Sequence, residues 1–262
     1  MILCAGEALI DMLPRESAAG EQAFAPYAGG AVFNTAIALG RLGAPVGFFS
    51  GISTDLFGDI LTRTLEASGV DASFAARPDR PTTLAFVTLT DGHASYAFYD
   101  ENTAGRMLSD TDLPDLDQDV QALFFGGISL VVEPCATAYE ALMMREASRR
   151  ATMIDPNIRP GFIKDEEAYR ARIGRMLQAA DIVKLSDEDL AWLAGHNDVA
   201  EAARDILRNG AKLVCITRGS EGVSGYTSAG EVSVSARKVD VVDTVGAGDT
   251  FNAGLLAALH DA

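Results

Sequence analysis

Short apolar runs alternate with longer stretches of helical spacing along this chain, and this alternation limits its fold more than any other feature. Runs of strand length occur at ILCAG, VGFFSG, ALFFGG, ATMID, DIVKLS and KLVCIT. Between them, FGDILTRTLEASGV places on one helical face the residues Phe57, Ile60, Leu61 and Leu65. Strands that alternate with helices predict an α/β fold with a mostly parallel central sheet flanked by helices on both faces.

Two segments depart from this alternation. PTTLAFVTLTDGHASYAFY, residues 81–99, contains two β-rich runs around Asp91-Gly92, which is typical of a hairpin. We expect a small β lid formed mainly by about 81–104, with part of 11–28 as a further candidate. VSGYTSAGEVSVSA, residues 223–236, predicts a second hairpin that extends an edge of the main sheet. Without repeats or low-complexity linkers, residues 1–262 are expected to form one α/β domain.

Composition excludes several classes of protein. The formal net charge of −16 repels nucleic acid and anionic membranes, so we expect neither as a partner. No run approaches the roughly 18 apolar residues of a membrane span, and MILCAGEALIDMLP lacks a signal-peptide pattern. We therefore expect a cytoplasmic protein. Cys4, Cys135 and Cys215 lack metal-site spacing and are expected to be free thiols.

The segment DTVGAGDTFNAG, residues 243–254, is the most informative about chemistry. It lacks the third glycine of a dinucleotide motif and the Lys-Ser/Thr pair of a P-loop. The turn Gly246-Ala247-Gly248 can instead direct backbone N–H groups at an anion, at the N-terminus of an apolar helix. Asp249 is then either a helix N-cap or a base that takes the proton of a hydroxyl attacking a phosphoryl group.

These stretches resemble the ribokinase or PfkB-type sugar kinases, and in particular their fructokinase-like branch. DTVGAGDTFNAG is similar to the C-terminal signature of that family, and GGAVFNTAIALGRLGAPVGFFSGISTDLFGD, residues 29–59, to its N-terminal signature. The resemblance runs from about Gly6 to the end and includes GEALIDML, RPTTLAFVTL, IDPNIRP, VKLSDEDL and ITRGSEGV. It implies a ribokinase-like fold and transfer of a phosphoryl group from ATP to a sugar, with Mg²⁺ and a candidate site for K⁺.

The resemblance also implies roles for individual residues. Asp249 matches the catalytic base, the turn from Gly246 through Ala247 and Gly248 matches the anion hole, and Arg159 matches an arginine that reaches the reaction centre. The implied sugar-binding residues are Asp11, Gly29, Gly30, Asn34, Phe98, Arg159 and Asp249. Without the resemblance, each residue also has a purely structural interpretation. Asp11 would be a turn cap and Gly29-Gly30 a tight turn, while Phe98 would pack in the core and Arg159 would lie on the surface.

For the nucleotide, candidate residues follow two strands, because ligands of open α/β sheets collect at the carboxyl ends of strands. They are Lys184, Ser186, Thr217, Gly219, Gly222, Gly246, Gly248 and Asn252. The family's Asn-x-x-Glu element for Mg²⁺ is here Ser186-Asp187-Glu188-Asp189, so Glu188 and Asp189 are both candidates. Asp243 is a candidate ligand of K⁺. The family continues past the signature helix with helices that wall the adenine, whereas this sequence ends at Ala262.

The leading substrate is a neutral sugar, with fructose first. The alternatives are a 2-keto-3-deoxygluconate kinase, a ribokinase-type kinase and a non-catalytic sugar-binding regulator. In FYDENTA, Asp100 stands where kinases of the acid sugar tend to carry arginine, and its charge would repel a carboxylate. Arg159 is expected to be the only cation nearby. A homodimer through the lid is considered as well.

Overall fold

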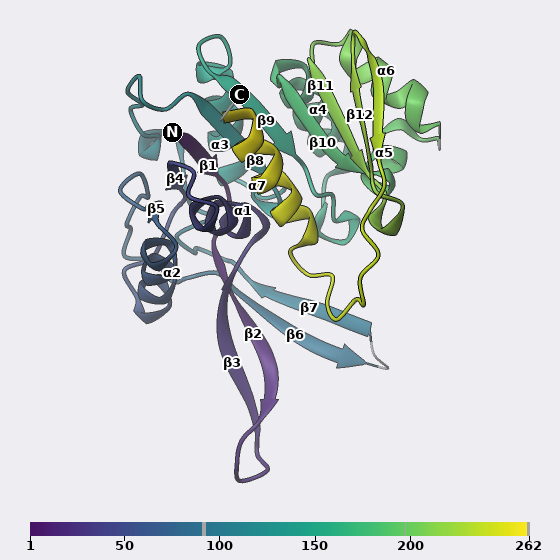
Figure 1. The fold of residues 1–262 in the computed structure, drawn as a ribbon. Coiled ribbons are helices and arrows are strands. Elements are labelled where there is room, and N and C mark those ends of the chain that lie inside the picture. Colours follow the sequence, from purple (N-terminus) through teal and green to yellow (C-terminus); the bar gives the residue numbers. More distant parts are fainter. Residues whose placement is uncertain (91–92, 197, 261–262) are drawn as a thin grey trace.

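The main sheet has nine strands and is mostly parallel, which confirms the predicted α/β class (Figure 1). The computed structural model describes residues 1–262 except 91–92, 197 and 261–262. For residues 88–90 and 93–96 it describes the backbone but not the side chains. Among the described pairings within this sheet, only β11–β12 and β12–β13 are antiparallel. In sheet order the strands are β13 (Gly230–Val234), β12 (Val223–Thr227), β11 (Leu213–Thr217), β10 (Ile182–Ser186), β9 (Ala151–Asp155), β8 (Ala122–Gly126), β1 (Ile2–Ala5), β4 (Val46–Phe49) and β5 (Val70–Asp71).

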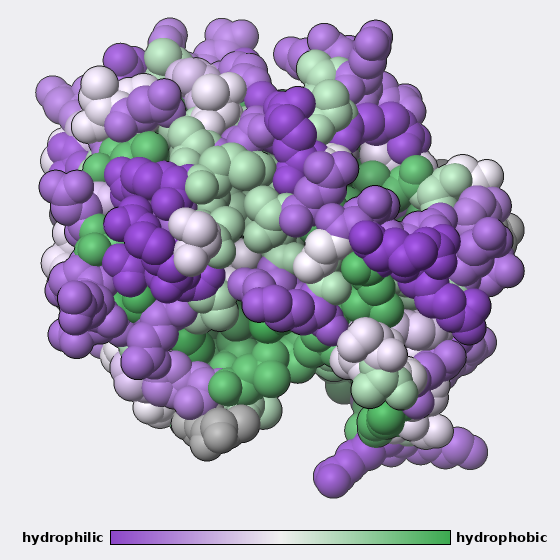
Figure 2. All heavy atoms as spheres, turned by 90° about the horizontal axis from the view of Figure 1, so that it is seen from above, coloured by the Kyte–Doolittle hydropathy of each residue, from purple (hydrophilic) through white to green (hydrophobic). Residues whose placement is uncertain are grey.

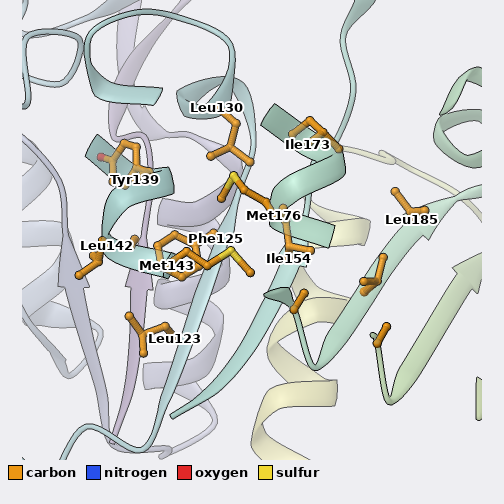
Figure 3. Packing of buried hydrophobic residues seen from close by; sticks show 14 of the residues in the cluster. Leu123, Phe125, Leu130, Tyr139, Leu142, Met143, Ile154, Ile173, Met176 and Leu185 are labelled. Carbon is orange, nitrogen blue, oxygen red and sulfur yellow. The ribbon is translucent and has the colours of Figure 1, made fainter. Parts of the chain in front are cut away.

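Helices cover both faces of this sheet, as the alternation predicts. Along β1, Ile2 and Cys4 face one layer and Leu3 and Ala5 face the other, because successive side chains of a strand point to opposite sides. One layer contains α1 (Ala31–Arg41), α2 (Leu56–Ala67) and α7 (Ala247–His260). The other contains α3 (Cys135–Glu146), α4 (Glu166–Ala179), α5 (Asp187–Ala194) and α6 (Val199–Arg208), whose core is shown in Figure 3.

Short 3₁₀ turns follow several strands at their carboxyl ends. They are η2 (Ile128–Leu130), η3 (Pro160–Phe162) and η4 (Gly219–Glu221), while η1 (Asp110–Asp112) lies in the acidic connector. All three cysteines are buried and free, as expected from the sequence. Within the described part of the chain, no helix is long and apolar enough to cross a membrane.

A second sheet of four strands forms the lid, at the carboxyl ends of the main strands (Figure 1). Its order is β3 (Gln22–Gly29), β2 (Leu9–Glu16), β6 (Leu84–Thr90) and β7 (His93–Tyr99). The hairpin predicted at 81–99 supplies β6 and β7, although its turn at 91–92 lies outside the described residues. Residues 9–29 supply the other two strands, a larger share than the sequence indicates. The hairpin at 223–236 becomes β12 and β13, at the edge of the main sheet.

The end of the main sheet opposite the lid has hydrophilic residues along its sides and apolar residues across its middle (Figure 2). There the buried carboxylate of Glu146, at the end of α3, accepts hydrogen bonds from Arg145 at 2.9 Å, Arg149 at 3.2 Å and Arg150 at 2.9 Å. Burial alone would raise the pKa of Glu146, but these arginines hold that pKa below its usual value. Arg150 also donates to the carbonyl oxygen of Val120 at 2.6 Å, which ties α3 to the start of β8.

Glu146→Gln should therefore destabilise the fold. The amide keeps one acceptor oxygen and loses the charge, so we expect the free energy of unfolding at pH 7 to fall by about 1–3 kcal/mol. Because the pKa of Glu146 is lowered in the folded state, its contribution is present above the unfolded pKa and is lost as pH falls through the folded value. Urea unfolding of wild type and Glu146→Gln at pH 7 and about pH 3.5 measures how the difference in their free energies of unfolding depends on pH. An equal difference at both pH values would contradict the role of the Glu146 charge.

Candidate active site

The signature segment places Asp249 in the first turn of α7. Gly246 precedes this helix with φ of 76°, a conformation that glycine adopts without strain. Because α7 begins at Ala247, Asp249 lies inside the helix and not at its N-cap. Its Oδ2 accepts a hydrogen bond of 2.9 Å from Nδ2 of Asn34 in α1. The carboxylate therefore faces a partner helix, as a functional side chain would, and does not cap its own backbone.

The environment of Asp249 raises the pKa of its carboxyl to about 6. Burial is the largest cause, and the nearby charge of Asp155 acts in the same direction. The hydrogen bond from Asn34 and the charges of Lys184 and Arg159 oppose this rise. Asp249 is thus mostly ionised at neutral pH, yet more basic than an ordinary aspartate.

The other predicted sugar-binding residues of the main domain lie beside this pair. A Cβ on Gly29 would stand 2.3 Å from Oδ2 of Asp11, so the Asp11 side chain packs directly over the glycine backbone. Gly30, with φ of 115°, precedes α1, and the N–H of Asn34 donates to its carbonyl oxygen at 2.8 Å. Burial raises the pKa of Asp11 to about 6. The structure therefore brings Asp11, the Gly-Gly turn, Asn34 and Asp249 into one continuous group.

Phe98 of the lid and Arg159 both lie next to the turn η3. Phe98 packs edge-to-face against Phe162 of η3, with ring centroids 4.8 Å apart. Arg159 immediately precedes η3, is exposed, and donates from Nη1 to the carbonyl oxygen of Ile158 at 3.0 Å. Its charge lowers the pKa of Asp249, which places the guanidinium within electrostatic reach of that carboxylate.

A cavity of about 510 Å³ lies between the base of the lid, the β8–η2 loop and the η3–α4 loop. Leu9 and Phe98 line it, whereas Asp11, Asn34 and Asp249 do not. Its basic lining residues are Arg106, Lys164 and Arg172. The expectation that Arg159 is the only cation near Asp249 is wrong because of Lys184, whose charge also lowers the pKa of Asp249. Asp100 also lines this cavity, but Nη1 of Arg106 pairs with it at 3.0 Å, which balances the negative charge.

A buried polar cluster beneath α7 was not predicted from the sequence. Oδ2 of Asp155, at the end of β9, accepts from Nζ of Lys184 and from Nδ2 of Asn252, both at 2.8 Å. All three residues are buried. A Cβ on Gly248 would lie 3.4 Å from Nζ of Lys184, so the ammonium group lies directly below the signature turn. A sequence signal did exist, because a lysine inside a buried strand requires a counter-charge.

The remaining nucleotide candidates gather at the ends of β10 and β11. Ser186 and Thr217 are register partners; Gly219, with φ of 49°, begins η4, and Gly222, with φ of 105°, follows it. Oγ of Ser186 accepts from the N–H of Asp189 at 3.0 Å and so caps α5. The nucleotide roles of these residues, and of Lys184 and Asn252, stay predictions.

The two candidates for Mg²⁺ differ in their surroundings. Asp189 is buried, and its carboxylate accepts from the N–H groups of Ile158 at 3.0 Å and Ser186 at 3.3 Å. Glu188 and Asp243 are exposed. Among the residues that the structure describes, no three His, Cys, Asp or Glu side chains converge as a metal site would require.

The chain belongs to the pfkB family of carbohydrate kinases, whose model matches residues 1–262. It is therefore an ATP-dependent phosphotransferase with a sugar hydroxyl as the acceptor. It is 61% identical to a fructokinase of Rhizobium leguminosarum bv. trifolii, over 99% of this chain and 79% of that protein. It is 34% identical to fructokinase-2 of Solanum lycopersicum, over 100% of this chain and 82% of that protein.

Solved structures show the same fold. A fructokinase from Xylella fastidiosa with bound ATP superimposes with a TM-score of 0.90 at 33% identity, covering 99% of this chain and 81% of that one. A fructokinase double mutant from Vibrio cholerae O395, bound to fructose, ADP and potassium ion, gives a TM-score of 0.89 at 28% identity, covering 100% and 84%. The ribokinase-like fold predicted from the sequence is thus confirmed.

The buried cluster predicts energetic coupling between Asp155 and Lys184. Asp155→Asn leaves a buried lysine without its counter-charge and should lower the free energy of unfolding by about 3 kcal/mol. Lys184→Met alone should also destabilise, because a buried carboxylate then lacks its cation. The double variant should lose less than the sum of the two single losses, by about 1 kcal/mol or more. Urea titrations of all four proteins measure this, and additive losses would contradict the pairing.

Proposed function

We propose that this chain is a fructokinase, which transfers the γ-phosphoryl group of ATP to a primary hydroxyl of fructose. The Asn34–Asp249 hydrogen bond at the mouth of α7 carries the proposal, because it presents a carboxylate beside a turn suited to an anion. Asp11 above Gly29 supplies an acceptor for sugar hydroxyls a short way off. The names of the relatives, fructokinases from bacteria and plants, support the same sugar.

Asp249 acts as the general base in this proposal. Asn34 occupies Oδ2, while Oδ1 has no hydrogen-bond partner among the described protein residues. Oδ1 can therefore take the proton of the acceptor hydroxyl as that oxygen attacks phosphorus. The raised pKa makes Asp249 a stronger base without protonating it at pH 7. Asn34 fixes the orientation of the carboxylate during this step.

The developing negative charge is stabilised by several groups of the chain. The backbone N–H groups from Gly246 to Asp249 form the positive end of the α7 dipole and bind the phosphoryl oxygens. Arg159 lies within electrostatic reach of Asp249 and can bridge substrate and phosphate oxygens. The ammonium of Lys184, below Gly248, adds positive charge behind the turn.

ATP and Mg²⁺ complete the proposed site. Bound Mg²⁺ would neutralise charge on the transferring phosphates. Glu188 suits this ion better than Asp189, because both carboxylate oxygens of Asp189 already accept backbone N–H bonds. Ser186, Thr217 and the η4 glycines would lie along the nucleotide.

We also propose that the lid mediates a homodimer. Phe24, Phe86 and Tyr99 form a row of edge-to-face contacts across the lid, with centroids 5.0 and 5.4 Å apart. Phe24 is 44% exposed and Tyr99 is 63% exposed, so this row gives the lid an accessible apolar face. Such a face favours association with a second copy.

Asp249→Asn should abolish most turnover while leaving the fold and sugar binding largely intact. We expect a fall in kcat of about 10²- to 10⁴-fold, the usual contribution of a general base. In the wild type, kcat should decline about tenfold per pH unit as pH falls below about 6, because protonated Asp249 cannot accept the proton. A coupled assay of ADP release measures kcat of the variant and the pH dependence of kcat in the wild type. Calorimetry with fructose measures whether the variant still binds the sugar. Normal turnover in Asp249→Asn would refute this mechanism.

The charge of the sugar tests the assignment of the substrate. We expect kcat/KM to be larger for fructose than for 2-keto-3-deoxygluconate, because the acid sugar would bring a carboxylate beside Asp11 and Asp249. Asp100→Arg should narrow this gap, since it removes the partner of Arg106 and adds a further cation to the cavity. Asp115→Arg, an exposed site in the acidic connector, is the control and should leave the ratio unchanged. A wild-type preference for the acid sugar would make the acid-sugar kinase the better assignment.

A further inference from the structure

Glu7 lies between β1 and β2 and has no role in the mechanism above. Its Oε1 accepts the N–H of Ala31 at 2.8 Å, and its Oε2 accepts the N–H of Ser129 at 3.3 Å. Ala31 opens α1, and Ser129 belongs to the turn η2 that follows β8. A single carboxylate therefore joins two segments that are far apart in the sequence. Glu7 and Ser129 also line the cavity at the base of the lid.

The backbones on both sides approach Glu7 so closely that only glycine fits. A Cβ on Gly127 would stand 2.1 Å from Oε1 of Glu7, and Gly127 has φ of 69°. A Cβ on Gly30 would stand 2.8 Å from the carbonyl oxygen of Glu7. Gly30 belongs to the turn assigned to the sugar. The close contact and the two hydrogen bonds independently indicate that Glu7 sets the position of this turn.

Hydrogen bonds connect the turn that Glu7 contacts to the carboxylate of Asp249. The N–H of Asn34 donates to Gly30, one residue before the backbone that Glu7 holds, and the Asn34 side chain donates to Asp249. On the other side, Ile128 and Ser129 form part of the cavity wall together with Phe98. A displacement at Glu7 would therefore move the Gly-Gly turn relative to Ile128 and Ser129.

We propose that Glu7 is a positioning residue, whose carboxylate holds the Gly29-Gly30 turn and Asn34 against the Ile128–Ser129 wall and thereby sets the affinity for the sugar. This inference rests on the proposed function. It requires a carboxylate in particular, since glutamine offers one acceptor oxygen and would turn an N–H group toward one of the two donors. A negative charge at the start of α1 also interacts favourably with that helix.

Glu7→Gln tests this role, with Glu146→Gln as the matched control. Burial raises the pKa of Glu7 to about 7, so the assays are run at about pH 8, where the carboxylate is ionised. Glu7→Gln should raise KM for fructose by about 10- to 100-fold, the effect of losing one hydrogen bond to a charged group. KM for ATP should change less than about twofold, because Glu7 contacts none of the nucleotide candidates. kcat should fall as well, because Glu7 holds Asn34 and Asn34 orients Asp249. Glu146→Gln should leave KM for fructose unchanged.

A second variant tests the same contact from the other side. Gly127→Ala places a methyl group against Oε1 and should raise KM for fructose selectively, even if Glu7→Gln fails to fold. An unchanged KM for fructose in a folded variant, or an equal rise in KM for ATP, would overturn the positioning role. If the wild type binds fructose without turnover, the proposed function fails while calorimetric Kd ratios of wild type and variants still decide the role of Glu7.

Discussion

The packing of α7 against α1 is the contact on which the rest of the site depends. Small and apolar residues of both helices share one core with β1, including Ala36 of α1 and Ala253 of α7. This close packing brings the side chain of Asn34 within 2.9 Å of Asp249. Once the two helices are in place, the sugar turn before α1 and the anion-binding turn before α7 open toward the same side. Substrate binding and chemistry are thus both set by one helix pair.

Negative and positive groups occupy separate positions around this helix pair. Asp249 faces the acceptor side, the backbone N–H groups of the signature turn face the phosphoryl side, and Lys184 lies behind the turn, paired with Asp155. The buried pair raises the pKa of Asp249 through Asp155 and lowers it through Lys184. The carboxylate therefore stays ionised at neutral pH even though it is largely out of water. On the lid side, Arg106 balances Asp100 in a similar way.

The layered fold could be predicted from the sequence, because the spacing of apolar residues shows which side chains of a strand or helix are buried. In ILCAG, for example, alternate residues face opposite layers. The sequence was also sufficient for Asn34 and Asp249, which lie in long motifs. It was insufficient for β2 and β3, where Pro14 and Pro26 argue against strands. The structure shows why they are tolerated: β6 pairs with β2 only as far as Met12, and β3 is an edge strand. The partners of Glu7 and Asp155 could not be predicted, because a long-range hydrogen bond leaves no local pattern.

The hydrogen bond between Asn34 and Asp249 joins positions 215 residues apart. Closing so large a loop is entropically unfavourable, and the contact forms only after the intervening strands have assembled. During synthesis on the ribosome, the face of α1 that receives α7, which includes Asn34 and Thr35, therefore stays exposed to solvent until α7 emerges. The segment that completes the active site is thus also the one that covers this surface. A nascent chain interrupted before α7 would be a substrate for chaperones rather than a weak enzyme.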